Sequence, residues 1–145
     1  MLRIPCEPHL RPQPFLRCRV CIEQIGRKKE EGDLRQRTKE FALAIIRLFG
    51  TWPKTPVAQV IGKQLLRAGT SIGANYREAY RGRSKPEFIA KCGDSLRELE
   101  ECGYWLELLV EARICSPATL EAVRNECDEL TAIFVAIIKR ARANP

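Results

Sequence analysis

Histidine is almost absent from the 145-residue sequence, with His9 as its single example, and aromatic residues make up only 7%. His9 lies in the N-terminal segment, so without a second histidine no conventional nucleophile–histidine pair can be built in the helical region that follows. The carboxylates of Glu98 and Glu101 lack the Glu-x-x-His spacing of di-iron bundles. No strand pattern is present, so no glycine-rich phosphate loop can follow a strand. We therefore expect a protein that is not an enzyme and needs no cofactor.

Long apolar runs are absent as well. The longest comprises the seven residues Ala132–Ile138, whereas a bilayer span needs about 20. The N-terminus has no apolar stretch of the signal-peptide kind. The composition, 45% hydrophobic and 30% charged, is that of an ordinary globular domain. The sequence therefore predicts a cytoplasmic protein with no membrane association.

Residues 1–33 differ from the rest of the chain. Prolines are dense in the first fourteen residues and prohibit a helix there. The cysteine and histidine residues of this segment have a spacing compatible with a tetrahedral zinc site. They are Cys6, His9, Cys18 and Cys21. We favour an irregular, disordered N-terminal extension and keep the zinc site as the alternative.

The sequence contains seven cysteines, an odd number. Cys92, Cys102 and Cys127 fall on or beside apolar helical stripes. A reduced thiol in such a position behaves as a small hydrophobe, and stable disulfides are rare in the cytoplasm. We expect these three to be core residues.

From Leu34 onward, apolar residues recur at helical spacing. Cap-and-proline signals at Thr55-Pro56 and Ser116-Pro117, and a capping box from Ser84 to Glu87, mark three helix starts. The expected helices span about 34–50, 55–82, 84–113 and 116–143. Short turns between amphipathic helices predict an all-α, up-down-up-down antiparallel four-helix bundle over residues 34–143.

Three stretches are more apolar than one buried stripe requires. Between Phe41 and Phe49 only Arg47 is polar. The stretches Tyr104–Val110 and Ala132–Ile138 are similarly rich in apolar residues. Apolar surface left over after a bundle closes marks an interaction site. We expect self-association to cover it, with a thick monomeric core as the alternative.

Charge is segregated along the sequence. Residues 34–91 contain twelve basic and three acidic side chains, a net charge of +9, whereas residues 92–138 contain three basic and ten acidic, a net charge of −7. The basic half of one copy can therefore meet the acidic half of another. Such a heterologous contact forms a ring when its rotation closes. We expect a ring-like homo-oligomer, and charge alone does not fix the number of subunits.

Four segments stand in order along the helical region: Arg37–Ala42, Gln64–Ala79, Ser84–Lys91 and Tyr104–Leu106. Together they resemble the bacterial four-helix-bundle family encoded in intervening sequences of large-subunit ribosomal RNA genes. The resemblance implies a small all-helical protein whose relatives form pentameric rings and whose molecular function is unassigned. It also implies a distant likeness to the accessory protein of diversity-generating retroelements, a basic pentamer that partners a reverse transcriptase and nucleic acid. Residues 1–33 and Cys92-Gly93-Asp94 depart from the family pattern.

Several residues of the second and third helices are expected to hold helices or subunits together. Gly69 and Gly73 each cost a helix about 1 kcal/mol relative to alanine, so close approach by another helix is the expected compensation. Polar residues beside the apolar face of the second helix could form an inter-helix or inter-subunit network with carboxylates of the third. The full set comprises Arg67, Gly69, Ser71, Gly73, Glu78, Glu98, Glu101 and Trp105.

The chain carries a net charge of +7 and has a pI near 9.2. A basic cluster at the turn between the second and third helices could bind phosphates. It comprises Arg77, Arg81, Arg83 and Lys85. Because aromatic platforms are few, we expect salt-sensitive, sequence-tolerant contacts to the backbone of RNA or DNA. The alternative is a protein–protein scaffold or adaptor with no nucleic-acid role.

Overall fold

The computed structural model describes residues 34–143, which belong to one compact unit of the chain, Glu31–Pro145. The segment 1–33, and with it the zinc ligand set Cys6, His9, Cys18 and Cys21, lies outside the described residues. Four helices follow one another: α2 (Leu34–Gly50), α3 (Pro56–Tyr80), α4 (Lys85–Glu111) and α5 (Pro117–Ala143). Among these residues there is no strand, and the all-α prediction is confirmed.

The helix starts lie at the predicted caps. The Thr55 hydroxyl accepts a hydrogen bond from the Ala58 N–H at 3.4 Å, with Pro56 as the first helical residue. The Ser84 hydroxyl accepts from the Glu87 N–H at 3.3 Å. The Glu87 carboxylate accepts from the N–H of Arg83, the residue before the cap. In an ideal capping box it would accept from the N–H of the cap residue Ser84 itself. Local side-chain chemistry therefore positions the starts of α3 and α4.

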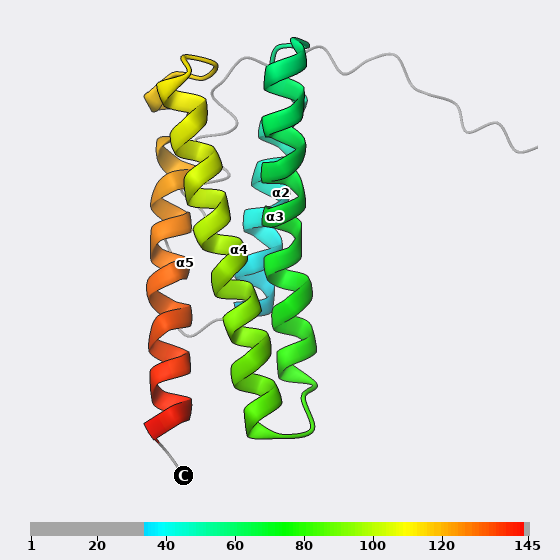
Figure 1. The fold of residues 1–145 in the computed structure, drawn as a ribbon, viewed down its shortest axis with the longest axis vertical. Coiled ribbons are helices and arrows are strands. Elements are labelled where there is room, and N and C mark those ends of the chain that lie inside the picture. The colour runs from blue at the N-terminus through cyan, green and yellow to red at the C-terminus, as the bar shows by residue number, and fades with distance from the viewer. Residues whose placement is uncertain (1–33, 144–145) are drawn as a thin grey trace, which may run out of the picture. The chain divides into compact units, whose positions relative to one another are not determined.

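The helices alternate in direction and form an antiparallel four-helix bundle (Figure 1). Each helix packs against its neighbour in sequence, and α2 also contacts α5, which closes the bundle. The α3–α4 contact is the most extensive and the α2–α5 contact the least, consistent with the shortness of α2, which has 17 residues. The α3–α4 turn and the end of α5 lie at the same end of the bundle (Figure 1).

The core is built from the predicted apolar stripes. Phe41, Leu65, Leu106 and Phe134 represent the four helices in it and are at most 1% exposed. The thiols of Cys92, Cys102 and Cys127 are buried and free, as expected for core residues. Among residues 34–143, the large apolar residues that remain exposed are Ile46, Val57, Val60, Tyr80 and Tyr104.

Glycines on one side of α3 let α2 approach closely. A Cβ on Gly69 would stand 2.3 Å from Ile45 Cδ1, and one on Gly73 would stand 3.2 Å from Thr38 Oγ1. Gly62, which the sequence did not single out, faces the rings of Phe49 and Trp52, and a Cβ on it would stand 2.4 Å from Phe49 Cε2 and 2.7 Å from Trp52 Cε3. The glycines thus follow the α2–α3 contact and admit side chains that alanine would obstruct.

Candidate nucleic-acid interface and inter-helix polar network

The four predicted phosphate-binding residues lie at the end of α3 and in the turn that follows it. Arg77, Arg81, Arg83 and Lys85 are all exposed. Within residues 34–143, none of their side chains takes part in an ion pair. Cations without an acidic partner keep their hydration and their positive potential, which makes them available to a phosphate.

Two further elements bring basic residues to the same end of the bundle (Figure 1). The last turns of α5 contribute Lys139, Arg140 and Arg142, and Arg35 in the first turn of α2 reaches the end of α3, where its guanidinium lies over the Tyr80 ring. We call this surface the basic end. It comprises Arg35, Arg77, Arg81, Arg83, Lys85, Lys139, Arg140 and Arg142.

Sequence reasoning found only the α3–α4 part of the basic end. The charge segregation between residues 34–91 and 92–138 does not include the basic residues after Ile138. The Lys139-Arg140 pair, directly after the acidic stretch 92–138, was the signal that could have revealed them. Because the helices pack antiparallel, the end of α5 lies at the same end of the bundle as the α3–α4 turn. The basic residues of both segments therefore make this end of the bundle positively charged. The helix dipoles do not explain this charge, because the C-termini of α3 and α5 favour cations at this end whereas the N-termini of α2 and α4 disfavour them.

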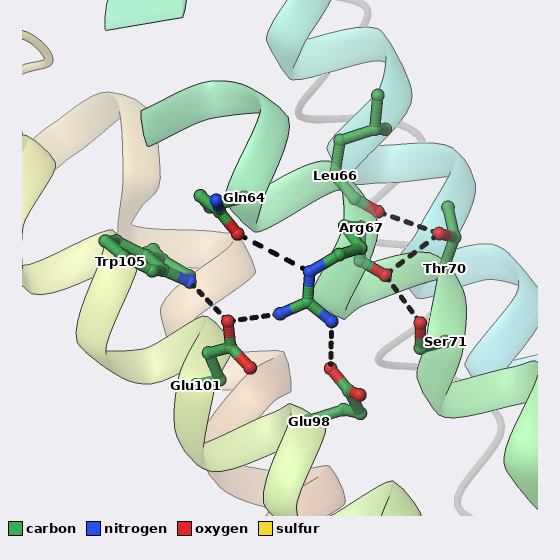
Figure 2. A network of polar contacts seen from close by, with 8 residues as sticks. All are labelled: Gln64, Leu66, Arg67, Thr70, Ser71, Glu98, Glu101 and Trp105. Carbon is green, nitrogen blue, oxygen red and sulfur yellow. Dashed lines mark hydrogen bonds and ion pairs between the residues drawn. The ribbon is translucent and has the colours of Figure 1, made fainter. Parts of the chain in front are cut away.

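A polar network joins the middle of α3 to α4 (Figure 2). The Arg67 guanidinium donates to Glu98 at 3.4 Å and also to Glu101. The Trp105 indole N–H donates to the same Glu101 carboxylate at 3.1 Å. Hydrogen bonding from Arg67, with a further contribution from Trp105, lowers the pKa of Glu101, and the carboxylates raise the pKa of Arg67. The network therefore favours the ionised forms of both groups.

Two predicted members of this network lie apart from it. The Ser71 hydroxyl donates to the backbone carbonyl of Arg67 at 2.8 Å and not to a carboxylate (Figure 2). The Glu78 carboxylate pairs with Lys91 of α4 at 2.6 Å. The structure thus brings together Arg67, Glu98, Glu101 and Trp105 and gives Glu78 a separate ion pair. Both sets of contacts join α3 to α4 within one chain.

The described part of the chain offers no metal site, because no group of three or more His, Cys, Asp or Glu side chains is placed to hold an ion there. Within the same residues, no helix is both long and apolar enough to span a bilayer.

The fold and its charge distribution define a basic antiparallel four-helix-bundle protein. The family model of the 23S rRNA-intervening sequence protein matches residues 30–136, and the chain belongs to this family.

The chain is also similar to a solved structure, the crystal structure of a protein with unknown function from the S23 ribosomal protein family of Bacteroides thetaiotaomicron. The two are 37% identical, with a TM-score of 0.68, over 72% of this chain and 97% of that one. Among curated proteins, none matched the chain.

Proposed function

We propose that this chain is a non-enzymatic, homo-oligomeric helical-bundle protein that binds RNA or another nucleic acid through its basic end. The observation that carries the proposal is the set of exposed cations that the end of α3, the α3–α4 turn and the end of α5 bring to one end of the bundle. Within residues 34–143, no ion pair involves Arg77, Arg81, Arg83, Lys85, Lys139, Arg140 or Arg142. Their phosphate contacts would release counterions, so binding should be strong at low salt and weak at high salt.

The arrangement supports contact with the sugar–phosphate backbone and not the reading of base edges. Lys and Arg side chains on exposed turns and helix ends suit phosphate oxygens, which carry no sequence information. The family's description as a 23S rRNA-intervening sequence protein is compatible with RNA as the partner. We therefore propose sequence-tolerant binding.

Self-association is the second part of the proposal. Ile46, Val57, Val60 and Tyr104 expose apolar surface away from the basic end, and burial of such surface stabilises association. In a ring whose axis runs parallel to the helices, the basic ends of all subunits would lie on one face of the assembly. Five subunits are the number that the family resemblance implies, and a reverse transcriptase is a protein partner that the retroelement likeness implies.

The experiment compares binding of a short structured RNA by the wild type and two neutralised variants. The test variant is Arg81→Gln/Arg83→Gln/Lys85→Gln, and the control, Arg47→Gln/Lys54→Gln/Lys63→Gln, removes the same charge from exposed residues elsewhere. The logarithm of affinity should fall with the logarithm of salt concentration by about 0.7 to 0.9 per phosphate contact. If each of its three cations contacts a phosphate, the test variant should lose about two to three units of this slope, and the control should keep the wild-type slope.

Absence of RNA binding by the wild type at low salt would contradict the nucleic-acid part of the proposal. An equal loss in both variants would assign the effect to net charge and not to the basic end. Light scattering at micromolar concentration tests assembly separately, because a monomeric mass would contradict it.

A scaffold or adaptor is the second candidate function. Val57 and Val60, 59% and 62% exposed, favour a protein contact near the start of α3. An oligomer that binds no RNA at any salt concentration would select this candidate.

A further inference from the structure

One exposed aromatic ring lies at the basic end. Tyr80 is the last residue of α3, and 62% of its surface is exposed. Tyr104, with 54% exposed, is comparable but lies in the C-terminal half of α4, away from the basic end. An exposed aromatic ring among cations combines the two features with which proteins hold single-stranded nucleic acid, a stacking platform and a positive surface.

The Tyr80 ring is held by a contact between helices. The Arg35 guanidinium of α2 lies over the ring, 4.4 Å from its centroid. A cation–π contact of this kind restrains the ring from one side. With most of its surface exposed, the ring still offers area to a second flat partner. Because the ring is already restrained, stacking on it loses less side-chain freedom than stacking on a mobile ring.

A shallow hollow of about 460 Å³ adjoins this ring. The residues that line it are Ala79, Tyr80, Gly82, Arg83, Ser84, Lys85 and Phe88. Two of them, Arg83 and Lys85, supply positive charge, and Gly82 has no side chain to obstruct a ligand. The nearby Glu87 carboxylate accepts a hydrogen bond from the Arg83 backbone N–H at 2.9 Å. This bond directs the carboxylate towards the helix start, where it satisfies a backbone donor.

We infer that this hollow takes one unpaired nucleotide of a single strand, with the base stacked on Tyr80 and the adjoining phosphates on Arg83 and Lys85. The inference rests on the proposed function and adds to it a preference for single strands over duplexes. Bases within a duplex are already stacked on one another and cannot reach the ring. Every base has a flat face, so stacking preserves the sequence tolerance of the proposed binding.

The test uses the full chain and one fluorescently labelled RNA of mixed sequence, either single-stranded or annealed to its complement. Tyr80→Ala should bind the single strand roughly 5- to 150-fold more weakly, the range that loss of one base stack produces. Tyr80→Phe, which keeps the ring, should stay close to the wild type. Tyr104→Ala is the matched control and should leave binding unchanged. None of the three variants should alter binding of the duplex.

An abasic strand separates stacking from indirect effects on the basic end. The wild type and Tyr80→Ala should bind such a strand equally, because no base is present to stack. Circular dichroism melting should show that each variant remains folded. If Tyr80→Ala does not fold, Tyr80→Leu replaces it, because leucine keeps apolar bulk without a stacking ring.

Three outcomes would overturn the inference. If Tyr80→Ala binds the single strand as the wild type does while neutralising Arg81, Arg83 and Lys85 weakens it, the stacking site is wrong and the proposed function stands. If Tyr80→Ala weakens single strand and duplex equally, the ring acts through the charges around it. If the wild type binds neither RNA at low salt, the proposed function fails together with the inference.

Discussion

The Arg37 guanidinium of α2 donates two hydrogen bonds to the Glu126 carboxylate of α5, from Nε to Oε1 at 2.6 Å and from Nη2 to Oε2 at 2.9 Å. Nη2 also donates to Glu129. Glu126 is 9% exposed, and hydrogen bonding to it is the largest cause of the raised pKa of Arg37. Because the α2–α5 contact is the least extensive of the four that close the bundle, this pair joins the two neighbouring helices with the smallest contact.

Replacing Arg37 by methionine should lower the free energy of unfolding by about 1–3 kcal/mol, because Glu126 would lose its charged partner in a largely buried place. The double variant Arg37→Met/Glu126→Leu should recover most of this loss. Urea unfolding measures both. Arg97→Met is the control, since the Arg97 side chain is 73% exposed, and it should change stability by less than about 0.5 kcal/mol. Unaltered stability of Arg37→Met would show that the pair does not close the bundle.

Two glycine substitutions should have opposite effects. Gly62→Ala places a methyl group within 2.7 Å of ring atoms of Phe49 and Trp52 and should destabilise the protein by about 1–3 kcal/mol through overpacking. Gly103→Ala adds a methyl group with no neighbour within 4 Å and should stabilise α4 by about 0.5–1 kcal/mol. Thermal melting distinguishes the two. A stabilising Gly62→Ala would mean that α2 does not approach α3 at this glycine.

The cysteine thiols should differ strongly in reactivity. Burial raises the pKa of Cys92 to about 11 and that of Cys127 to about 12, and it raises the pKa of Cys102 as well. Cys115 is only half-buried. Because the thiolate is the reactive form, an alkylating reagent at pH 8 should label Cys115 first. Mass spectrometry of the folded protein should follow labelling in a variant without Cys6, Cys18 and Cys21.

The same reagent in guanidinium chloride provides the reference for these thiols. All four should then react at similar rates, because unfolding removes the burial. Rapid labelling of Cys102 or Cys127 in the folded protein would contradict their place in the core.

Glu101 should titrate below the usual carboxyl range in the wild type and closer to its usual value of 4.5 in Arg67→Gln, because Arg67 is the main cause of its lowered pKa. A carboxyl group with a lowered folded-state pKa adds stability above its unfolded pKa, and this stability is lost as the pH falls through the folded value. As the pH falls below about 4.5, the wild type should therefore lose more stability than Arg67→Gln. Carboxyl NMR titration checks the pKa, and Arg97→Gln should leave it unchanged.

Arg113→Gly should stabilise the protein by about 0.5–1 kcal/mol. Arg113 follows the end of α4 with φ of 57°, and it is the single described residue other than glycine with positive φ. Glycine adopts this conformation without the steric cost of a Cβ. A shift of the urea midpoint to higher concentration with an unchanged slope would agree with this expectation, and an unchanged or lower midpoint would contradict it.

The sequence predicted the helices to within two residues because their boundaries depend on local chemistry. Thr55-Pro56 and Ser84 cap helices whichever way the bundle packs. The Arg37–Glu126 pair was not predictable in this way, since 89 residues separate its members and no spacing rule connects them. Gly62 was missed for the same reason, because Phe49 and Trp52 belong to the preceding helix and its turn. The basic end could not be predicted from the spacing of residues, because its basic residues come together only when the helices pack antiparallel.

The basic end gives each bundle an electric dipole that points along its helices towards the α3–α4 turn. In the field of a polyanion, such a dipole experiences a torque that turns this end forward before contact. Val57 and Val60, near the start of α3, would then face away from the polyanion. Orientation at a distance would thus keep apolar contacts accessible to other copies while the opposite end is engaged. A single helical bundle could therefore assemble and bind at the same time, without one contact obstructing the other.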